Sequence, residues 1–188
     1  TNERYGRGEI APLSNKLSLH AWRGERVSAQ AVLMCPQAEN HVSFEISDLT
    51  SGKNRIAAEN VRKYFVRYIM TDQFKNAAGE GGCGAREKSK MDSSLVADAL
   101  DATPSMDVEA QTSRPLWLDI RVPQGAAPGK YTGKLTVNVG NLKLTLPLTL
   151  DVAKRTLPEP KDWTFHLDLW QNPFAVARYY NVPLWSKA

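Results

Sequence analysis

Residues 131–152 read YTGKLTVNVGNLKLTLPLTLDV, and this stretch decides the fold class. Apolar and polar side chains alternate along 131–139 and again along 142–152, with the period of two that is typical of β-strands. The two residues between them, Gly140 and Asn141, predict a tight hairpin. Five leucines (142, 144, 146, 148 and 150) are expected on one face. Pro147 falls on the other face, which predicts an edge or bulged position because proline donates no ladder hydrogen bond.

The same alternation recurs before this hairpin, in segments separated by turn-forming residues: 17–22, 27–34, 41–49, 61–70 and 116–122. About seven short strands with turns between them predict a mainly β chain, folded as an antiparallel immunoglobulin-like β-sandwich. Two segments break the pattern. Residues 71–91 predict a long surface loop, and residues 92–101 predict one or two helical turns with Leu95, Val96 and Leu100 facing inward.

A different pattern begins after the sandwich. Residues 157–161, LPEPK, predict a stiff linker because of their prolines. Residues 163–170 alternate as a strand, and Asn172-Pro173 is a typical helix start before the predicted helix 174–180. We expect 162–188 to open a larger α/β domain, after a sandwich over 1–156. If that domain is a (β/α)8 barrel, these residues are its truncated first strand and helix. The alternative is that this tail packs on the sandwich as an extra element.

Composition and charge restrict the class of protein. The 188 residues are 42% hydrophobic and 23% charged, which excludes collagen, a disulfide-rich miniprotein and a disordered tail. Residues 53–90 hold nine Lys and Arg against four acidic residues. No RNA-binding or zinc-finger motif accompanies this charge, so a solvated strand and loop is favoured over a nucleic-acid partner. No apolar run reaches the length of a membrane span.

The cysteines and histidines say little about disulfide pairing or metal binding. Cys35 and Cys83 either pair in an exported protein or leave Cys35 as a buried thiol in an apolar strand. His20, His41 and His166 are far apart in the sequence and show no metal-ligand pattern, so no metal site is expected. No cofactor is expected either. The chain starts at Thr1 without a leader, so either a signal peptide has been removed or the sequence has been trimmed at this end. If a signal peptide has been removed, we expect a periplasmic or extracellular protein.

Residues 1–156 contain no recognisable catalytic constellation, and no two carboxylates are adjacent anywhere in the chain. The candidate site is His166, Asp168 and Trp170, on the strand predicted to open the barrel. Residues at the carboxyl end of a barrel strand face the active site, and a carboxylate beside an aromatic ring suits a sugar. The alternative is that Trp170 packs in an interface and Asp168 caps the next turn.

Several motifs resemble those of glycoside hydrolase family 123. They are RPLWLDIRVP (114–123), APGKYTGKLTV (127–137), WRGERVSAQ (22–30), LVADAL (95–100) and FHLDLWQNP (165–173). The first four resemble the N-terminal β-sandwich of that family, and the last resembles the entry into its catalytic barrel. The resemblance implies a retaining β-N-acetylgalactosaminidase, in which the substrate's own acetamido oxygen attacks the anomeric carbon.

The resemblance also implies that an adjacent Asp-Glu pair in the barrel orients the acetamido group and transfers the proton. This chain has no such pair, so no catalytic residue is assigned and the fragment itself is expected to be inactive. His166, Asp168 and Trp170 are carried over only as residues at the rim of a sugar pocket. The implied partners are a glycan containing N-acetylgalactosamine and the protein's own C-terminal barrel. The alternative is a stand-alone carbohydrate-binding or surface adhesion sandwich.

Overall fold

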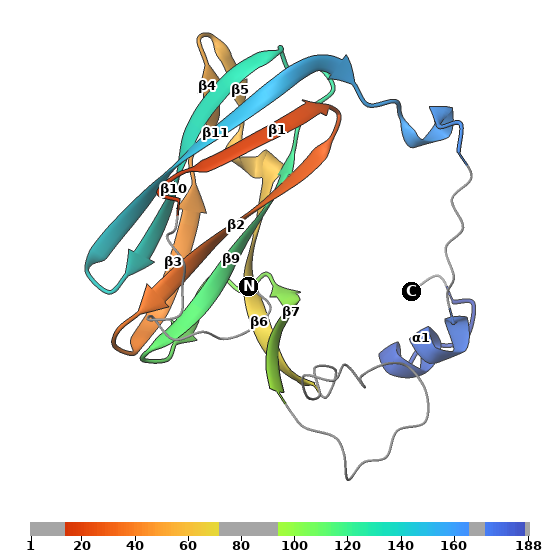
Figure 1. The fold of residues 1–188 in the computed structure, drawn as a ribbon. Coiled ribbons are helices and arrows are strands. Elements are labelled where there is room, and N and C mark those ends of the chain that lie inside the picture. Colours follow the sequence, from red (N-terminus) through yellow and green to blue (C-terminus); the bar gives the residue numbers. More distant parts are fainter. Residues whose placement is uncertain (1–13, 72–93, 166–171, 187–188) are drawn as a thin grey trace, which may run out of the picture. The chain divides into compact units, whose positions relative to one another are not determined.

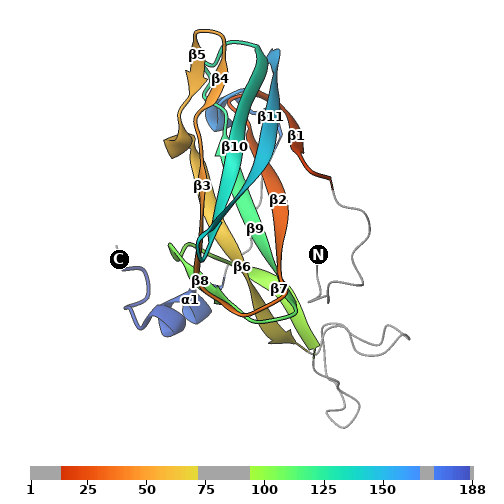
Figure 2. The ribbon, with the colours of Figure 1, turned by 90° about the vertical axis from the view of Figure 1, so that its left-hand side faces the viewer.

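The computed structural model describes residues 14–71, 94–165 and 172–186. The chain divides into two compact units, 1–157 and 158–188. The larger unit consists of two β-sheets, shown in Figure 1 and from the side in Figure 2. The prediction of a mainly β chain is confirmed. The finer immunoglobulin-like assignment stays a prediction.

The seven-stranded sheet has the order β1-β11-β10-β3-β8, and β4 and β5 branch from β10. Its strands are β1 (Leu17–Arg23), β3 (Glu39–Ile46), β4 (Leu49–Ser51), β5 (Asn54–Ile56), β8 (Met106–Val108), β10 (Gly129–Val139) and β11 (Leu142–Thr156). The four-stranded sheet has the order β2-β9-β6-β7. Its strands are β2 (Arg26–Cys35), β6 (Val61–Thr71), β7 (Ser94–Asp101) and β9 (Thr112–Arg121), and a short 3-10 helix, η2 (Ala58–Asn60), precedes β6.

The β10–β11 hairpin forms in the predicted register. Val139 pairs with Leu142 across the turn, and Gly140 takes a φ of +55° there. Strand β1 pairs with β11 in parallel, whereas every other strand pair in the described residues is antiparallel. The wholly antiparallel prediction therefore fails at one pair. Alternation reveals which face of a strand is buried, but it carries no information about the direction of the partner strand.

The core lies between the two sheets. The rings of Phe44 on β3 and Phe65 on β6 meet edge to face, with centroids 5.0 Å apart. Around them lie aliphatic side chains from both sheets that are at most 1% exposed: Val42, Leu49, Ile56, Val108, Leu116, Leu118, Ile120, Val122, Leu135, Leu148 and Leu150. The inward half of each alternating strand thus supplies a single hydrophobic core.

Burial of the leucine face of β11 decreases toward the hairpin turn. Leu148 and Leu150 are buried, whereas Leu142 and Leu144 are exposed. Leu144 and Leu146 line an open apolar cleft of about 170 Å³ together with residues of β2, β9 and β10. The β1 partner of β11 begins only at Leu148, so within the described residues Pro147 is paired on one side, with Lys134 of β10. At Pro147, therefore, β11 is an edge strand, as the sequence predicted.

The helical prediction for residues 92–101 is wrong. Residues 94–101 form strand β7, which pairs with β6 at the edge of the four-stranded sheet. Asp98 is the extra residue of a bulge, because Arg67 pairs with Ala99 while Tyr68 pairs with Ala97. Leu95 and Leu100 were expected to face inward but are exposed. Only Phe65 and earlier residues of β6 pair with β9, so β6 and β7 continue beyond the sheet as a two-stranded ribbon (Figure 1).

The smaller unit contains a 3-10 helix, η4 (Pro160–Asp162), and one α-helix, α1 (Pro173–Tyr180). Asn172 caps α1 as predicted, since its Oδ1 accepts a 3.1 Å hydrogen bond from Ala175 N. Residues 163–165 of the predicted strand are irregular, and 166–171 lie outside the described residues. The assignment of this unit to the first strand and helix of a barrel stays a prediction. Of the predicted loop at 71–91, Thr71 is the last residue of β6, and residues 72–91 lie outside the described residues.

Candidate functional site

The three predicted sugar-contacting residues, His166, Asp168 and Trp170, lie outside the described residues. Their roles therefore stay predictions. The segments beside them are described. Trp163 stacks on Phe165 with ring centroids 4.9 Å apart, and its Nε1 donates a 2.9 Å hydrogen bond to the carbonyl oxygen of Pro158.

The smaller unit exposes most of its large apolar side chains. These are Phe165, Phe174, Val176, Tyr179, Tyr180 and Trp185, and each is at least half exposed. No residue of α1 is buried. Exposed aromatic and aliphatic side chains at such a density are typical of an interaction surface.

The larger unit holds the end of β11 firmly where the chain leaves it. Leu157 N donates a 2.7 Å hydrogen bond to the carbonyl oxygen of Arg23, and Leu157 O accepts one of 3.4 Å from Gln124 Nε2. Gly24 makes this approach possible. Its φ is +82°, and a Cβ there would lie 3.0 Å from Gln124 Cγ and 3.4 Å from Leu157 O.

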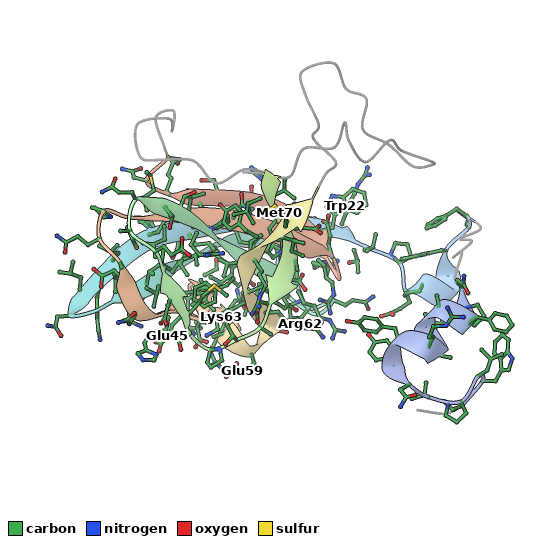
Figure 3. All side chains as sticks on the ribbon, turned by 90° about the horizontal axis from the view of Figure 1, so that it is seen from below. Trp22, Glu45, Glu59, Arg62, Lys63 and Met70 are labelled. Carbon is green, nitrogen blue, oxygen red and sulfur yellow. The ribbon has the colours of Figure 1, made fainter. Side chains whose placement is uncertain are left out.

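A pocket of about 380 Å³ opens beside this exit. It is lined by His20, Ala21, Trp22, Glu25, Asp151, Ala153 and Leu157. His20 and Asp151 are cross-strand partners in the parallel β1–β11 pair, and their Nδ1 and Oδ2 atoms are 3.5 Å apart. The Trp22 side chain is 41% exposed and is labelled in Figure 3. We call this the exit pocket.

Two contacts fix Trp22 in the exit pocket. Its backbone N donates a 2.7 Å hydrogen bond to Glu25 Oε2, across the turn that connects β1 to β2. The guanidinium of Arg155 on β11 lies over its indole ring, 5.6 Å from the centroid. The pocket thus combines an indole ring, an imidazole and two carboxylates on a paired strand framework. Such a set can bind a polar ligand that also has an apolar face.

The exit pocket was not predicted from the sequence. His20 and Trp22 lie two residues apart on β1, and Asp151 lies on β11. Only the parallel pairing of β1 with β11 brings these side chains together. That pairing joins strands more than 100 residues apart, and no local pattern encodes it.

The shifted pKa values lie away from the exit pocket and have structural causes. The pKa of Asp48 is lowered because its side chain accepts hydrogen bonds from Arg55 and from Ala58 N. The pKa of Asp101 is lowered by a hydrogen bond from Thr103 N and by Arg67. Burial, with a smaller effect of Glu39, raises the pKa of the buried Cys35 thiol. Cys83, its possible partner, lies outside the described residues.

Within residues 14–71, 94–165 and 172–186, no three His, Cys, Asp or Glu side chains are grouped so that they could hold a metal ion. Over the same ranges, no helix is both long enough and apolar enough to cross a bilayer.

Comparison with known proteins identifies a family. The model of the glycoside hydrolase 123 N-terminal domain matches residues 1–139. The chain is also similar to a solved structure of a family 123 glycoside hydrolase from Clostridium perfringens, reported in a study of glycolipid glycan hydrolysis, with a TM-score of 0.77 and 21% identity. The match covers 90% of this chain and 28% of that one. This chain therefore spans less than a third of that relative.

Two further solved structures are less similar. AvmM, which catalyses macrocyclization in alchivemycin A biosynthesis, has a TM-score of 0.40 and 10% identity, over 74% of this chain and 87% of its own. The CooA pilin subunit from enterotoxigenic Escherichia coli has a TM-score of 0.37 and 12% identity, over 84% of this chain and 99% of its own. Both scores are too low to bear on function. A search of curated proteins found no match.

Proposed function

The chain belongs to glycoside hydrolase family 123 through its N-terminal domain, and from this membership we propose that it is the non-catalytic domain of a hydrolase. The proposed reaction is cleavage of terminal β-linked N-acetylgalactosamine with retention of configuration. The observation that carries the proposal is the family match over residues 1–139.

In the proposed reaction the substrate supplies its own nucleophile. Its acetamido oxygen attacks the anomeric carbon while a carboxylic acid protonates the departing glycosidic oxygen, and water then opens the cyclic intermediate. A second carboxylate beside that acid would hold the acetamido group in place. This chain has no adjacent carboxylate pair, which supports the proposal that the fragment alone is inactive. His166, Asp168 and Trp170 are proposed only as residues at the rim of the sugar site.

We propose that the domain braces a catalytic barrel. The β6–β7 ribbon supports this role, because Ile69, Met70, Leu95 and Leu100 are exposed where the ribbon extends beyond its sheet. The exposed aromatic side chains of residues 158–188 support it as well. Apolar groups of this number are unfavourable in water and are stabilised when a neighbouring domain covers them.

The test is to express the reading frame with the sequence that follows Ala188 and to assay it on aryl β-N-acetylgalactosaminide and aryl β-N-acetylglucosaminide. Turnover of the galacto substrate is expected from the longer protein and none from residues 1–188. Hydrolysis by residues 1–188 alone would contradict the non-catalytic role. A longer protein that hydrolyses only the gluco substrate, or neither, would contradict the proposed specificity.

Bracing has its own test. In the longer protein, Met70→Lys and Leu95→Lys introduce a charge into the proposed contact without touching the core. Each is expected to lower the unfolding temperature of the longer protein but to leave that of residues 1–188 nearly unchanged. The matched control is Leu142→Lys, at an exposed leucine on β11 near the hairpin turn. An equal effect of all three substitutions would contradict a specific contact at the ribbon.

A second candidate function is a stand-alone carbohydrate-binding or surface adhesion module, and the exit pocket favours it. This alternative would be supported if the longer protein hydrolysed neither substrate while residues 1–188 bound a sugar. For either function we propose a periplasmic or extracellular location, where glycans are exposed. Fractionation of the producing cells tests it, and recovery of the protein only from the cytoplasm would contradict it.

A further inference from the structure

We propose that the exit pocket is a binding site for one neutral sugar residue of a glycan, separate from any catalytic centre. Trp22 would form the platform for the apolar face of the sugar ring. Asp151, Glu25 and His20 would bind its hydroxyl groups. The inference rests on the geometry of β1, β11 and the turn after β1, and it stands whether or not the longer protein hydrolyses N-acetylgalactosamine.

The Trp22 ring is exposed yet held in position. At 41% exposure a large part of the indole is available to a ligand. Arg155 lies over the ring, and the hydrogen bond from Trp22 N to Glu25 holds the turn that carries it. The C–H groups on one face of a pyranose form an apolar surface that packs against such a ring.

The polar groups of the pocket have capacity for further hydrogen bonds. The Asp151 side chain is 55% exposed and that of His20 is 83% exposed, so both are accessible to a ligand. A carboxylate has about four acceptor positions. Among the described residues, the His20 contact to Asp151 and the Trp22 N–H bond to Glu25 use one oxygen of each carboxylate. Sugar hydroxyls are the donors that such acceptors require.

The size and rigidity of the pocket fit one sugar ring. Its volume of about 380 Å³ falls in the range of about 300–1,000 Å³ that is typical of small-molecule sites. His20 and Asp151 stand opposite each other in a hydrogen-bonded strand pair, and strands hold side chains more accurately than loops do. Backbone hydrogen bonds hold the turn at Gly24 and the chain exit at Leu157, and Leu157 lines the pocket.

The charges of the pocket argue against an anionic ligand. Glu25 and Asp151 both line it, so a phosphate or a sugar acid would meet two carboxylates. A cationic ligand is the main competitor, because indole rings and carboxylates also attract ammonium groups. Arg155 already lies over the indole ring, so a cationic ligand would meet a like charge there and a neutral sugar would not.

The experiment is a nuclear magnetic resonance titration of ¹⁵N-labelled residues 1–188. The probes are methyl β-galactoside, methyl N-acetyl-β-galactosaminide, methyl β-glucoside and choline. The indole N–H signal of Trp22 is assigned by its loss in Trp22→Phe. At least one glycoside is expected to shift this signal and the amide signals of His20 and Asp151 in a saturable way, while choline does not.

Variants make the test specific. Trp22→Ala is expected to weaken binding about tenfold, as loss of a stacked aromatic contact does. Asp151→Asn should also weaken binding, and because Asp151 is exposed the variant is expected to fold. The matched controls lie in the smaller unit: Trp185→Ala, at an exposed tryptophan, and Asp162→Asn, at an exposed aspartate. Both are expected to bind as the unmodified chain does.

Three results would overturn the inference. They are no saturable shift with any glycoside, saturation by choline alone, and shifts that the Trp22 and Asp151 variants leave unchanged. If no sugar binds and the Trp22 signal is instead shielded from a soluble quencher in the longer protein, the pocket is a contact between domains. The hydrolysis assay is independent of all these measurements, so failure of the site and failure of the proposed function are distinguishable.

Discussion

The hydroxyl group of Tyr131 donates a 2.8 Å hydrogen bond to the carbonyl oxygen of Ala127, four residues earlier in the chain. Tyr131 is only 1% exposed, so the bond ties the start of β10 to the loop before it within the core. Gly129 lies between the two partners and takes a φ of +146°. The APGKYTG motif is thus a structural corner, which explains its residue types without a catalytic role.

Tyr131→Phe is expected to lower the free energy of unfolding by about 1 kcal/mol, because it removes the donor and leaves the Ala127 carbonyl without it. Urea denaturation of the two chains measures the difference. Tyr179→Phe, at a tyrosine on the exposed surface of α1, serves as the control and should change little. Equal stabilities of the Tyr131 variant and the unmodified chain would contradict a stabilising bond.

The second glycine of this motif is required for a different reason. A Cβ at Gly133 would lie 2.5 Å from Leu49 Cδ2 and 2.9 Å from the carbonyl oxygen of Asp48. We expect Gly133→Ala to destabilise the chain by about 2 kcal/mol, since overpacking forces backbone to move. Gly125→Ala is the matched control, because a Cβ there meets nothing within 4 Å. A Gly133 variant as stable as the control would show that β4 shifts away at little cost.

Local patterns predicted those parts of the fold in which partners are neighbours in sequence. The β10–β11 hairpin and the Asn172 cap of α1 are of this kind, since one turn or one side chain specifies each. Strand β7 was misread because Ala and Leu favour helices, while its pairing with β6 decided the outcome. The exit pocket depends on the parallel β1–β11 pair, which is equally non-local. The sequence-predicted site at 166–170 lies outside the described residues.

Asp48 links acid stability to β5 and the start of η2. Its carboxylate accepts hydrogen bonds from Arg55 Nε and, at 2.9 Å, from Ala58 N, and these lower its pKa. A carboxyl group whose folded-state pKa is lowered stabilises the fold above its ordinary pKa of about 4, and this stability is lost as the pH falls through the lowered value. We therefore expect Asp48→Asn to lower the unfolding temperature at neutral pH and to flatten its decline in acid.

Unfolding temperatures measured from neutral pH down to strong acid test this expectation. Asp162→Asn, at an exposed aspartate of the smaller unit, controls for the loss of one negative charge. Curves for the Asp48 variant and the unmodified chain that stay parallel throughout would exclude Asp48 as a source of the acid dependence.

Cys35 is expected to be unreactive in the folded chain. It is 3% exposed at the end of β2, and both burial and the nearby Glu39 raise its pKa, so little thiolate is present at neutral pH. In a Cys83→Ser background, a thiol reagent should modify Cys35 only slowly, and the rate should rise steeply in denaturant. Glu39→Gln removes the negative charge that makes the smaller contribution to the raised pKa of Cys35, so it should speed the reaction only slightly. Rapid modification without denaturant would mean that β2 opens locally at this end, because a buried thiol must reach solvent before it reacts.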